Sequence, residues 1–125
     1  NVGYPAYLNW EQMVELREAG HYFASHSLNH PDLRKLKPEE ARKQLVNSKA
    51  LLENKLGQPV TVFCYPLGSH SEEIVGWLKE AGYEAACTLE LGYIQRTEND
   101  GLYRLRRIWV GYSTTLEGFA SRLPW

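Results

Sequence analysis

The sequence predicts one α/β domain built around a largely parallel sheet, and three observations support this prediction. The chain has 125 residues, a length typical of a single domain. Hydrophobic residues make up 43% of it and charged residues 23%, which is the composition of an ordinary globular protein. Helical and strand-like patterns alternate along the chain, with no linker, internal repeat or low-complexity segment between them.

Four amphipathic patterns predict helices. They cover residues 10–19, 38–56 and 72–81, and a closing segment that runs from about residue 115 to 123. Capping-box spacing marks three of the helix starts, at Asn9 with Gln12, Ser69 with Glu72, and Thr114 with Glu117. The second helix instead starts with Pro38 in its first turn. The first three helices are expected to end at Gly20, Gly57 and Gly82.

Strand-like runs lie between these helices. They cover residues 21–25, 60–65, 83–88 and 105–110, and a loop over 89–103 contains the turn signal Asn99-Asp100-Gly101. Four strands are few for a closed barrel or for a doubly wound sheet. The sequence therefore predicts part of a larger α/β fold.

Net charge and composition indicate which partners and cellular compartments can be expected. Fourteen Lys and Arg against fifteen Asp and Glu give a net charge of -1, so we expect no nucleic acid partner. No apolar run reaches the roughly 18 residues of a membrane span. The chain starts without a signal peptide or an initiator Met, so we expect the natural start to lie upstream. Cys64 and Cys87 lie in apolar runs and are expected to be buried free thiols, which leaves the redox compartment open.

His26 and His30 are the first candidates for chemistry. They are four residues apart in a polar segment directly after a predicted strand, where reactive groups of parallel α/β folds collect. Two neutral imidazoles at this spacing can reach one cation, with Asn29 and Asp32 available to fix the ring tautomers. The alternative is two surface histidines without a ligand. The motif His-Glu-x-x-His is absent, which does not support a zincin-type protease.

The turn Tyr65-Pro66-Leu67-Gly68 is the second candidate, because a Pro-x-Gly turn at a strand end can direct a backbone N–H outward to stabilise an oxyanion. His21 is expected to be structural, and His70 to be an exposed loop residue or a substrate contact. Cys64 is a weak candidate nucleophile, because its apolar setting raises the thiol pKa. Trp77, Trp109 and Trp125 are expected in the core; a tryptophan exposed at the strand ends would instead indicate sugar stacking.

Several motifs together resemble one known family. The segment Gly20-His21-x-x-x-Ser25-His26-Ser27-x-x-His30-Pro31-x-Leu33 resembles the metal-binding motif of the polysaccharide deacetylases, carbohydrate esterase family 4. Gln58-Pro59-Val60 through Phe63-x-Tyr65-Pro66-x-Gly68 resembles the next motif of that family. Leu78-x-x-Ala81-Gly82-Tyr83-x-Ala85-Ala86 and Leu105-x-Arg107-Ile108 resemble its later βα units. The match covers about residues 6 to 123 in the family's order.

The resemblance implies a distorted (β/α) barrel of which the first strands are missing, so that residues 1–125 form one incomplete catalytic domain. It implies hydrolysis of N- or O-acetyl groups on a polysaccharide such as chitin, peptidoglycan or poly-N-acetylglucosamine, by a secreted or cell-envelope protein. A divalent metal, Zn or alternatively Co or Ni, would be bound by His26, His30 and one aspartate. The Leu67 N–H would complete the oxyanion hole, Ser27 would brace the loop, and Tyr65 and Pro66 would contact substrate.

The sequence also departs from the family pattern. No Asp precedes Asp32, so the general base and third ligand are absent from this chain, which we expect to be inactive alone. The family's Arg is replaced by Cys64, its aromatic by Leu67, and no His follows His70 to act as general acid. The alternative function is therefore a non-catalytic carbohydrate-binding or structural homologue. A response-regulator-like domain would need a phosphoacceptor Asp at a strand end, which is not found. Exposed sheet edges predict a homodimer or domain swap.

Overall fold

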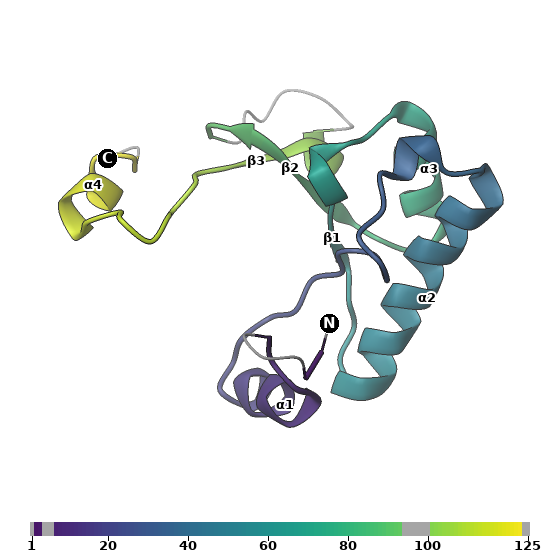
Figure 1. Ribbon diagram of the computed structural model, residues 1–125, viewed down its shortest axis with the longest axis horizontal. Helices are drawn as coiled ribbons and strands as arrows, with labels where there is room; N and C mark the ends of the chain where they lie inside the picture. The colour runs from purple at the N-terminus through teal and green to yellow at the C-terminus, as the bar shows by residue number, and fades with distance from the viewer. Residues whose placement is uncertain (1, 4–6, 94–100, 124–125) are drawn as a thin grey trace.

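A computed structural model describes residues 2–3, 7–93 and 101–123. Helices and parallel strands alternate in it, as predicted (Figure 1). The α-helices are α1 (Trp10–Glu18), α2 (Pro38–Leu56), α3 (Glu72–Glu80) and α4 (Leu116–Ala120). The strands are β1 (Val62–Cys64), β2 (Ala85–Leu91) and β3 (Leu105–Arg107), and the short 3-10 turns are η1 (Leu33–Lys35), η2 (Pro66–Gly68) and η3 (Gly101–Arg104). The strands form one parallel sheet in the order β1-β2-β3.

The core lies on one side of this sheet. Figure 1 shows α2 and α3 together on that side, and α4 at the end of an extended segment far from both helices. Phe63 and Ala86 of the sheet are fully buried against Leu45 of α2 and Leu78 of α3. Side chains alternate between the two faces of a strand. Cys64 therefore belongs to the opposite face, which α2 and α3 leave uncovered.

Three of the predicted helices match the structure closely. At α1 the Asn9 side chain accepts from the Gln12 N–H and Gln12 accepts from the Asn9 N–H, which completes the predicted capping box. The range of α2 agrees at both ends, with Pro38 in its first turn and Gly57 following it at a φ of 64°. The Arg17 guanidinium donates to the Leu56 carbonyl and so ties α1 to the end of α2.

Two predicted helix caps are wrong. The cap of α3 is Ser71, which accepts from the Ile74 N–H, because the Ser69 hydroxyl is already used in a 2.7 Å hydrogen bond to Asp32. The cap of α4 is Thr115, which accepts from the Gly118 N–H. Thr114 instead accepts from Gly111 and closes the preceding turn. In both cases the hydroxyl of the expected cap has a competing partner that the local sequence does not reveal.

The predicted strand over residues 21–25 is also wrong, because only Ser25 pairs, in a single parallel bridge with Phe63. Ahead of it the Tyr22 hydroxyl accepts from the Thr61 N–H at 2.7 Å, so a side chain occupies the backbone donor that a strand would use. The other strands differ from prediction in their bounds. Strands β1 and β3 are each shorter than expected, while β2 starts later and continues further.

The three tryptophans predicted to lie in the core differ in their outcome. Trp77 is in the core with 6% of its surface exposed, as expected. Trp109 is 62% exposed, because the chain stops pairing after Arg107 and leaves the sheet. Trp125 lies outside the described residues, as do two residues of the expected turn at 99–101.

Candidate functional site

The histidine loop, residues 26–30, starts from a fixed point on the sheet. Ser25 is fully buried, its N–H donates to Val62 at 2.9 Å, and its carbonyl accepts from Cys64 at 2.7 Å. Its hydroxyl lies 2.7 Å from the hydroxyl of Ser48 on α2. The residue before His26 is thus held by the strand on one side and by a helix on the other.

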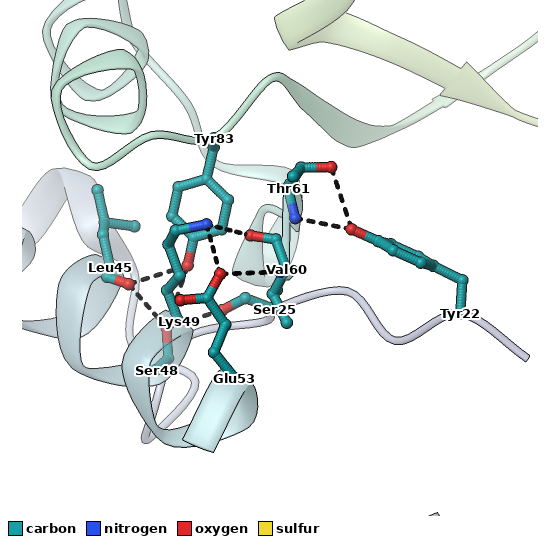
Figure 2. Close-up of polar contacts among 9 residues, drawn as sticks. All are labelled: Tyr22, Ser25, Leu45, Ser48, Lys49, Glu53, Val60, Thr61 and Tyr83. Atoms are coloured by element: carbon teal, nitrogen blue, oxygen red, sulfur yellow. Dashed lines mark hydrogen bonds and ion pairs between the residues drawn. The ribbon is translucent and has the colours of Figure 1, made fainter. Parts of the chain in front are cut away.

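A buried cluster of hydroxyl groups connects Ser25 to the core (Figure 2). The hydroxyls of Ser48 and Tyr83 both donate to the Leu45 carbonyl, at 3.1 and 2.9 Å. Burial raises the pKa of the Tyr83 hydroxyl, which keeps it protonated and able to donate. Buried polar groups stabilise a structure only when they are paired. Because this cluster is paired, it fixes the position of Ser25 relative to α2.

The loop itself is closed by hydrogen bonds to its backbone. The His30 N–H donates to the Ser27 hydroxyl at 3.0 Å, and both residues adopt positive φ angles, 55° and 66°. The carboxamide oxygen of Gln44, on α2, accepts from the N–H groups of Leu28 and Asn29. Non-glycine residues in the left-handed region are uncommon, and such strain gathers at functional sites. This loop is therefore held in one unusual conformation by Ser27 and Gln44.

The two histidine rings lie together within this loop. Their centroids are 4.8 Å apart with an interplanar angle of 72°, and both side chains are exposed. The Nδ1 atom of His26 lies 2.7 Å from the Cys64 carbonyl oxygen. A carbonyl can only accept, so Nδ1 donates this bond and Nε2 keeps a free lone pair. The Cys64 carbonyl thus fixes the His26 tautomer, as the outer partner of a metal-ligating histidine does.

The ring arrangement fits two ligands of one divalent cation. With metal–nitrogen distances of about 2.0–2.1 Å and a tetrahedral angle, two imidazole centres lie roughly 5 Å apart. The observed 4.8 Å agrees with that value. Across the described residues, however, no cluster of three His, Cys, Asp or Glu side chains that could hold a metal is found. The loop thus brings together two imidazole rings, and a complete metal site would need further ligands besides them.

Asn29 and Asp32 do not contact the rings in the way expected. The Asp32 carboxylate accepts from the Ser69 hydroxyl and from the Arg34 N–H, which with Lys35 nearby lowers its pKa. Asn29 is instead held through its backbone N–H by Gln44. Asp32 therefore links η1 to the turn before α3, while the Cys64 carbonyl orients His26.

The second candidate, the turn at Leu67, has a distinctive backbone. Leu67 adopts a φ of 58°, and the N–H groups of Gly68 and Ser69 close the turn by donating to Tyr65 and Pro66. The N–H of Leu67 takes no part in these two bonds. Gly68 has a φ of 68°, and a Cβ there would lie 3.0 Å from the Leu89 side chain. Glycine at this position therefore avoids both a strained backbone and a tight contact with Leu89.

The side chains around this turn are more buried than expected. Tyr65 and Pro66, predicted to contact substrate, are buried, and the Tyr65 hydroxyl donates to the Tyr103 carbonyl at 2.9 Å. Burial raises the pKa of Tyr65. His70, expected to be an exposed loop residue or a substrate contact, is half-buried, and its ring stacks on the Tyr65 ring with the centroids 5.2 Å apart. Conversely, His21 was expected to be structural, and its side chain is exposed.

An open groove of about 660 Å³ joins the histidine loop to a residue that the sequence analysis missed. Tyr7 lines this groove together with residues 26–30, and its ring is largely exposed. Gln44 was missed as well. Gln44 bonds to the loop backbone and Tyr7 lines the groove beside the loop, and neither belongs to a motif. In the sequence, Gln44 is only a polar residue within a predicted helix, and Tyr7 only an aromatic residue ahead of the first helix.

Comparison with known proteins identifies the family. The family model described as polysaccharide deacetylase matches residues 2–86, more than half of the chain. This chain belongs to the polysaccharide deacetylase family. YxkH of Bacillus subtilis, provisionally named a polysaccharide deacetylase, is 32% identical over 110 residues, which are 88% of this chain and 39% of YxkH. The family resemblance seen in the sequence motifs is thereby confirmed.

Solved structures agree with the fold of a polysaccharide deacetylase. The Streptococcus pyogenes deacetylase PplD, solved with acetate, matches with a TM-score of 0.88 and 26% identity, over 98% of this chain and 53% of PplD. BA3943 of Bacillus anthracis, described as a CE4 family pseudoenzyme, matches with a TM-score of 0.58 and 25% identity, over 62% of this chain and 27% of its own. The chain thus spans about half or less of these relatives. None of the helices in its described part has the length and apolar character needed to cross a bilayer.

Proposed function

We propose that the complete protein hydrolyses acetyl groups on an N-acetylglucosamine-type polysaccharide with the help of a divalent metal, Zn or alternatively Co or Ni. The observation that carries this proposal is the pairing of His26 with His30, with His26 oriented by the Cys64 carbonyl. Membership of the deacetylase family supports the reaction class. Imidazole nitrogen is a common ligand of all three metals.

Each part of the site has a defined task in this proposal. Nε2 of His26 and a ring nitrogen of His30 bind the cation, which when bound supplies a Lewis acid for the acetyl carbonyl. Ser27 and Gln44 hold the histidine loop in the conformation that keeps the rings together. The N–H of Leu67 donates to the oxyanion that develops on the carbonyl oxygen.

The proposed reaction needs more groups than the two histidines. A third metal ligand and a general base are both needed, and no cluster of three ligating side chains occurs among the described residues. Because no Asp precedes Asp32, where the family pattern has its Asp-Asp motif, we propose that the chain of 125 residues does not hydrolyse acetyl groups by itself.

Exposed aromatic side chains support a carbohydrate substrate. Tyr7 lines the groove beside the histidine loop. Trp109 follows the end of β3 and is 62% exposed, which is the placement that indicates sugar stacking. A Cβ on Gly111 would overlap the Trp109 ring, so the indole rests directly on that glycine. Aromatic rings with one face exposed offer apolar area at low entropic cost.

The test is acetate release from acetylated chitooligosaccharides by the full-length protein loaded with Zn. We expect release by the wild type and its loss in His26→Ala and His30→Ala. His21→Ala removes an exposed histidine outside the loop and is expected to retain activity. Equal activity in all three variants would contradict the proposal.

A second candidate function is a non-catalytic carbohydrate-binding homologue. It is favoured by Cys64 and Leu67, which replace the Arg and the aromatic of the family pattern, and by the similarity to a CE4 pseudoenzyme. The same experiment separates the two functions when binding of the oligosaccharide is measured alongside acetate release. Binding without release would favour the second function.

A further inference from the structure

The two cysteines of the chain are direct neighbours in the sheet. Cys64 of β1 and Cys87 of β2 are paired in register, and the Tyr65 N–H donates to the Cys87 carbonyl at 3.1 Å. Neighbouring strands lie about 4.7–4.9 Å apart, which is within the Cα separation of about 4.4–6.8 Å that a disulfide spans. The register therefore places the two residues at a strand spacing that falls within the Cα range of disulfides.

Both thiols also point to the same side of the sheet. Residues paired in register project to the same face, and the neighbours of each cysteine, Phe63 and Ala86, point into the helix-covered core. Cys64 and Cys87 thus lie on the face that α2 and α3 leave uncovered, where both are half-buried free thiols. A small reagent can therefore reach them.

The groups around the two cysteines affect the pKa of the Cys64 thiol. Burial raises the pKa of the Cys64 thiol, and the adjacent Cys87 thiol raises it further, while the guanidinium of Arg107 opposes both effects. Arg107 is held in place by a 2.8 Å hydrogen bond from its Nε to the Thr88 carbonyl. The raised pKa agrees with the expectation that Cys64 is a weak nucleophile on its own.

We propose that Cys64 and Cys87 form a dithiol that a small-molecule disulfide, such as oxidised glutathione, converts into an intrachain disulfide. One thiolate attacks the small disulfide, which gives a mixed disulfide and releases one glutathione thiol. The second protein thiolate then attacks the sulfur bound to the chain, forms the Cys64–Cys87 bond and releases the second glutathione. Two electrons and two protons pass from the cysteines to one oxidised glutathione. This proposal does not depend on the proposed function.

The cysteine pair is in direct contact with the histidine loop. The carbonyl of Cys64 accepts the hydrogen bond from His26, so the disulfide would link β1 to β2 at the strand end on which His26 rests. The oxidised and reduced forms would therefore differ in how firmly that end of the sheet is joined.

The test uses the folded 125-residue chain, in which these are the only two cysteines. After incubation with excess oxidised glutathione, we expect an intact mass lower by two hydrogens, no thiol that reacts with iodoacetamide, and a peptide linking Cys64 to Cys87. The matched variants Cys64→Ser and Cys87→Ser cannot close the bond and are expected to keep bound glutathione. A wild type that keeps glutathione on both cysteines, stays fully reduced, or links to a second chain would overturn the proposal.

Discussion

The hydroxyl group of Tyr83 connects the core to the candidate site. It donates to the Leu45 carbonyl and lies beside Ser48, whose hydroxyl contacts Ser25 at the start of the histidine loop. All four groups are buried, so water cannot replace a lost partner. The stability of the molecule and the position of the loop therefore depend on the same hydrogen bonds.

Replacement of Tyr83 by Phe tests this dependence. We expect the free energy of unfolding to fall by about 1–2 kcal/mol, because a buried carbonyl and a serine lose a partner. Tyr112→Phe is the matched control, because the Tyr112 side chain is fully exposed, and it should change stability by less than about 0.5 kcal/mol. Urea unfolding of both variants measures the difference. Equal effects would show that the hydroxyl cluster contributes nothing.

The environment of Glu53 makes part of the protein's stability depend on pH. Its carboxylate accepts from the Val60 N–H and pairs with Lys49, both at 2.9 Å, and these contacts lower its pKa from the ordinary 4.5 (Figure 2). A lowered pKa stabilises the folded state above that ordinary value, and the stabilisation is lost as the pH falls through the folded-state pKa.

Glu53→Gln removes the titrating group. We expect its unfolding free energy to fall less than that of the wild type between neutral pH and a pH below the folded-state pKa. Glu15→Gln, at an exposed position on α1, is the matched control and should keep the wild-type fall. Urea unfolding at both pH values measures this. A fall of wild-type size in Glu53→Gln would contradict the assignment.

Two glycines test the account at the scale of the helices. Gly57 ends α2 at a φ of 64°, whereas Gly76 lies inside α3, where an added Cβ meets no atom within 4 Å. Gly57→Ala should destabilise the protein by about 1 kcal/mol or more, because alanine is strained at positive φ. Gly76→Ala should stabilise it by roughly 0.5–1 kcal/mol through helix propensity. Thermal unfolding measures both, and effects of the same sign would contradict the account.

Local signals decided which elements could be predicted from the sequence. Pro38 and Gly57 define the two ends of α2, and the predicted range agrees with the structure at both. The strand over 21–25 could not be excluded locally, because its pairing depends on the contact between Tyr22 and Thr61. The cap of α3 moved from Ser69 to Ser71 for the same reason, since Asp32 competes for the first hydroxyl.

The candidate site was predictable to a similar degree. The spacing of His26 and His30 brings two rings into one loop, as the structure shows. The role of the Cys64 carbonyl was not predictable, because every residue has a backbone carbonyl and the side chain does not show which one accepts a hydrogen bond. Tyr65 illustrates the opposite case. It lies in a motif, yet its side chain is used in the core, through the hydrogen bond to the Tyr103 carbonyl.

At the scale of the whole molecule, the uncovered surfaces favour self-association. Within the described residues β3 is an edge of the sheet, and edge strands can pair with other chains. Apolar side chains are exposed from the end of β2 to α4, at Leu89, Leu91, Val110 and Leu116. We propose that two copies associate through this region, either edge to edge or by exchange of the α4 segment (Figure 1).

Light scattering after size exclusion tests this association. We expect a mass of twice 14.4 kDa for the chain, and a shift towards monomer in Leu116→Glu, which places a charge on the largely exposed Leu116. Glu117→Gln, on the same helix, is the control and should keep the wild-type mass. A monomer at every concentration of the wild-type chain would contradict the proposal.

The most direct test of the central claim is a calorimetric titration of the metal-stripped chain with Zn. We predict micromolar binding, about -8 kcal/mol, and a loss of roughly tenfold or more in affinity for His30→Ala. His21→Ala, which changes an exposed histidine outside the loop, should bind as the wild type does. Affinity that is absent from the wild type, or unchanged in His30→Ala, would contradict the claim that His26 and His30 form a metal-binding pair.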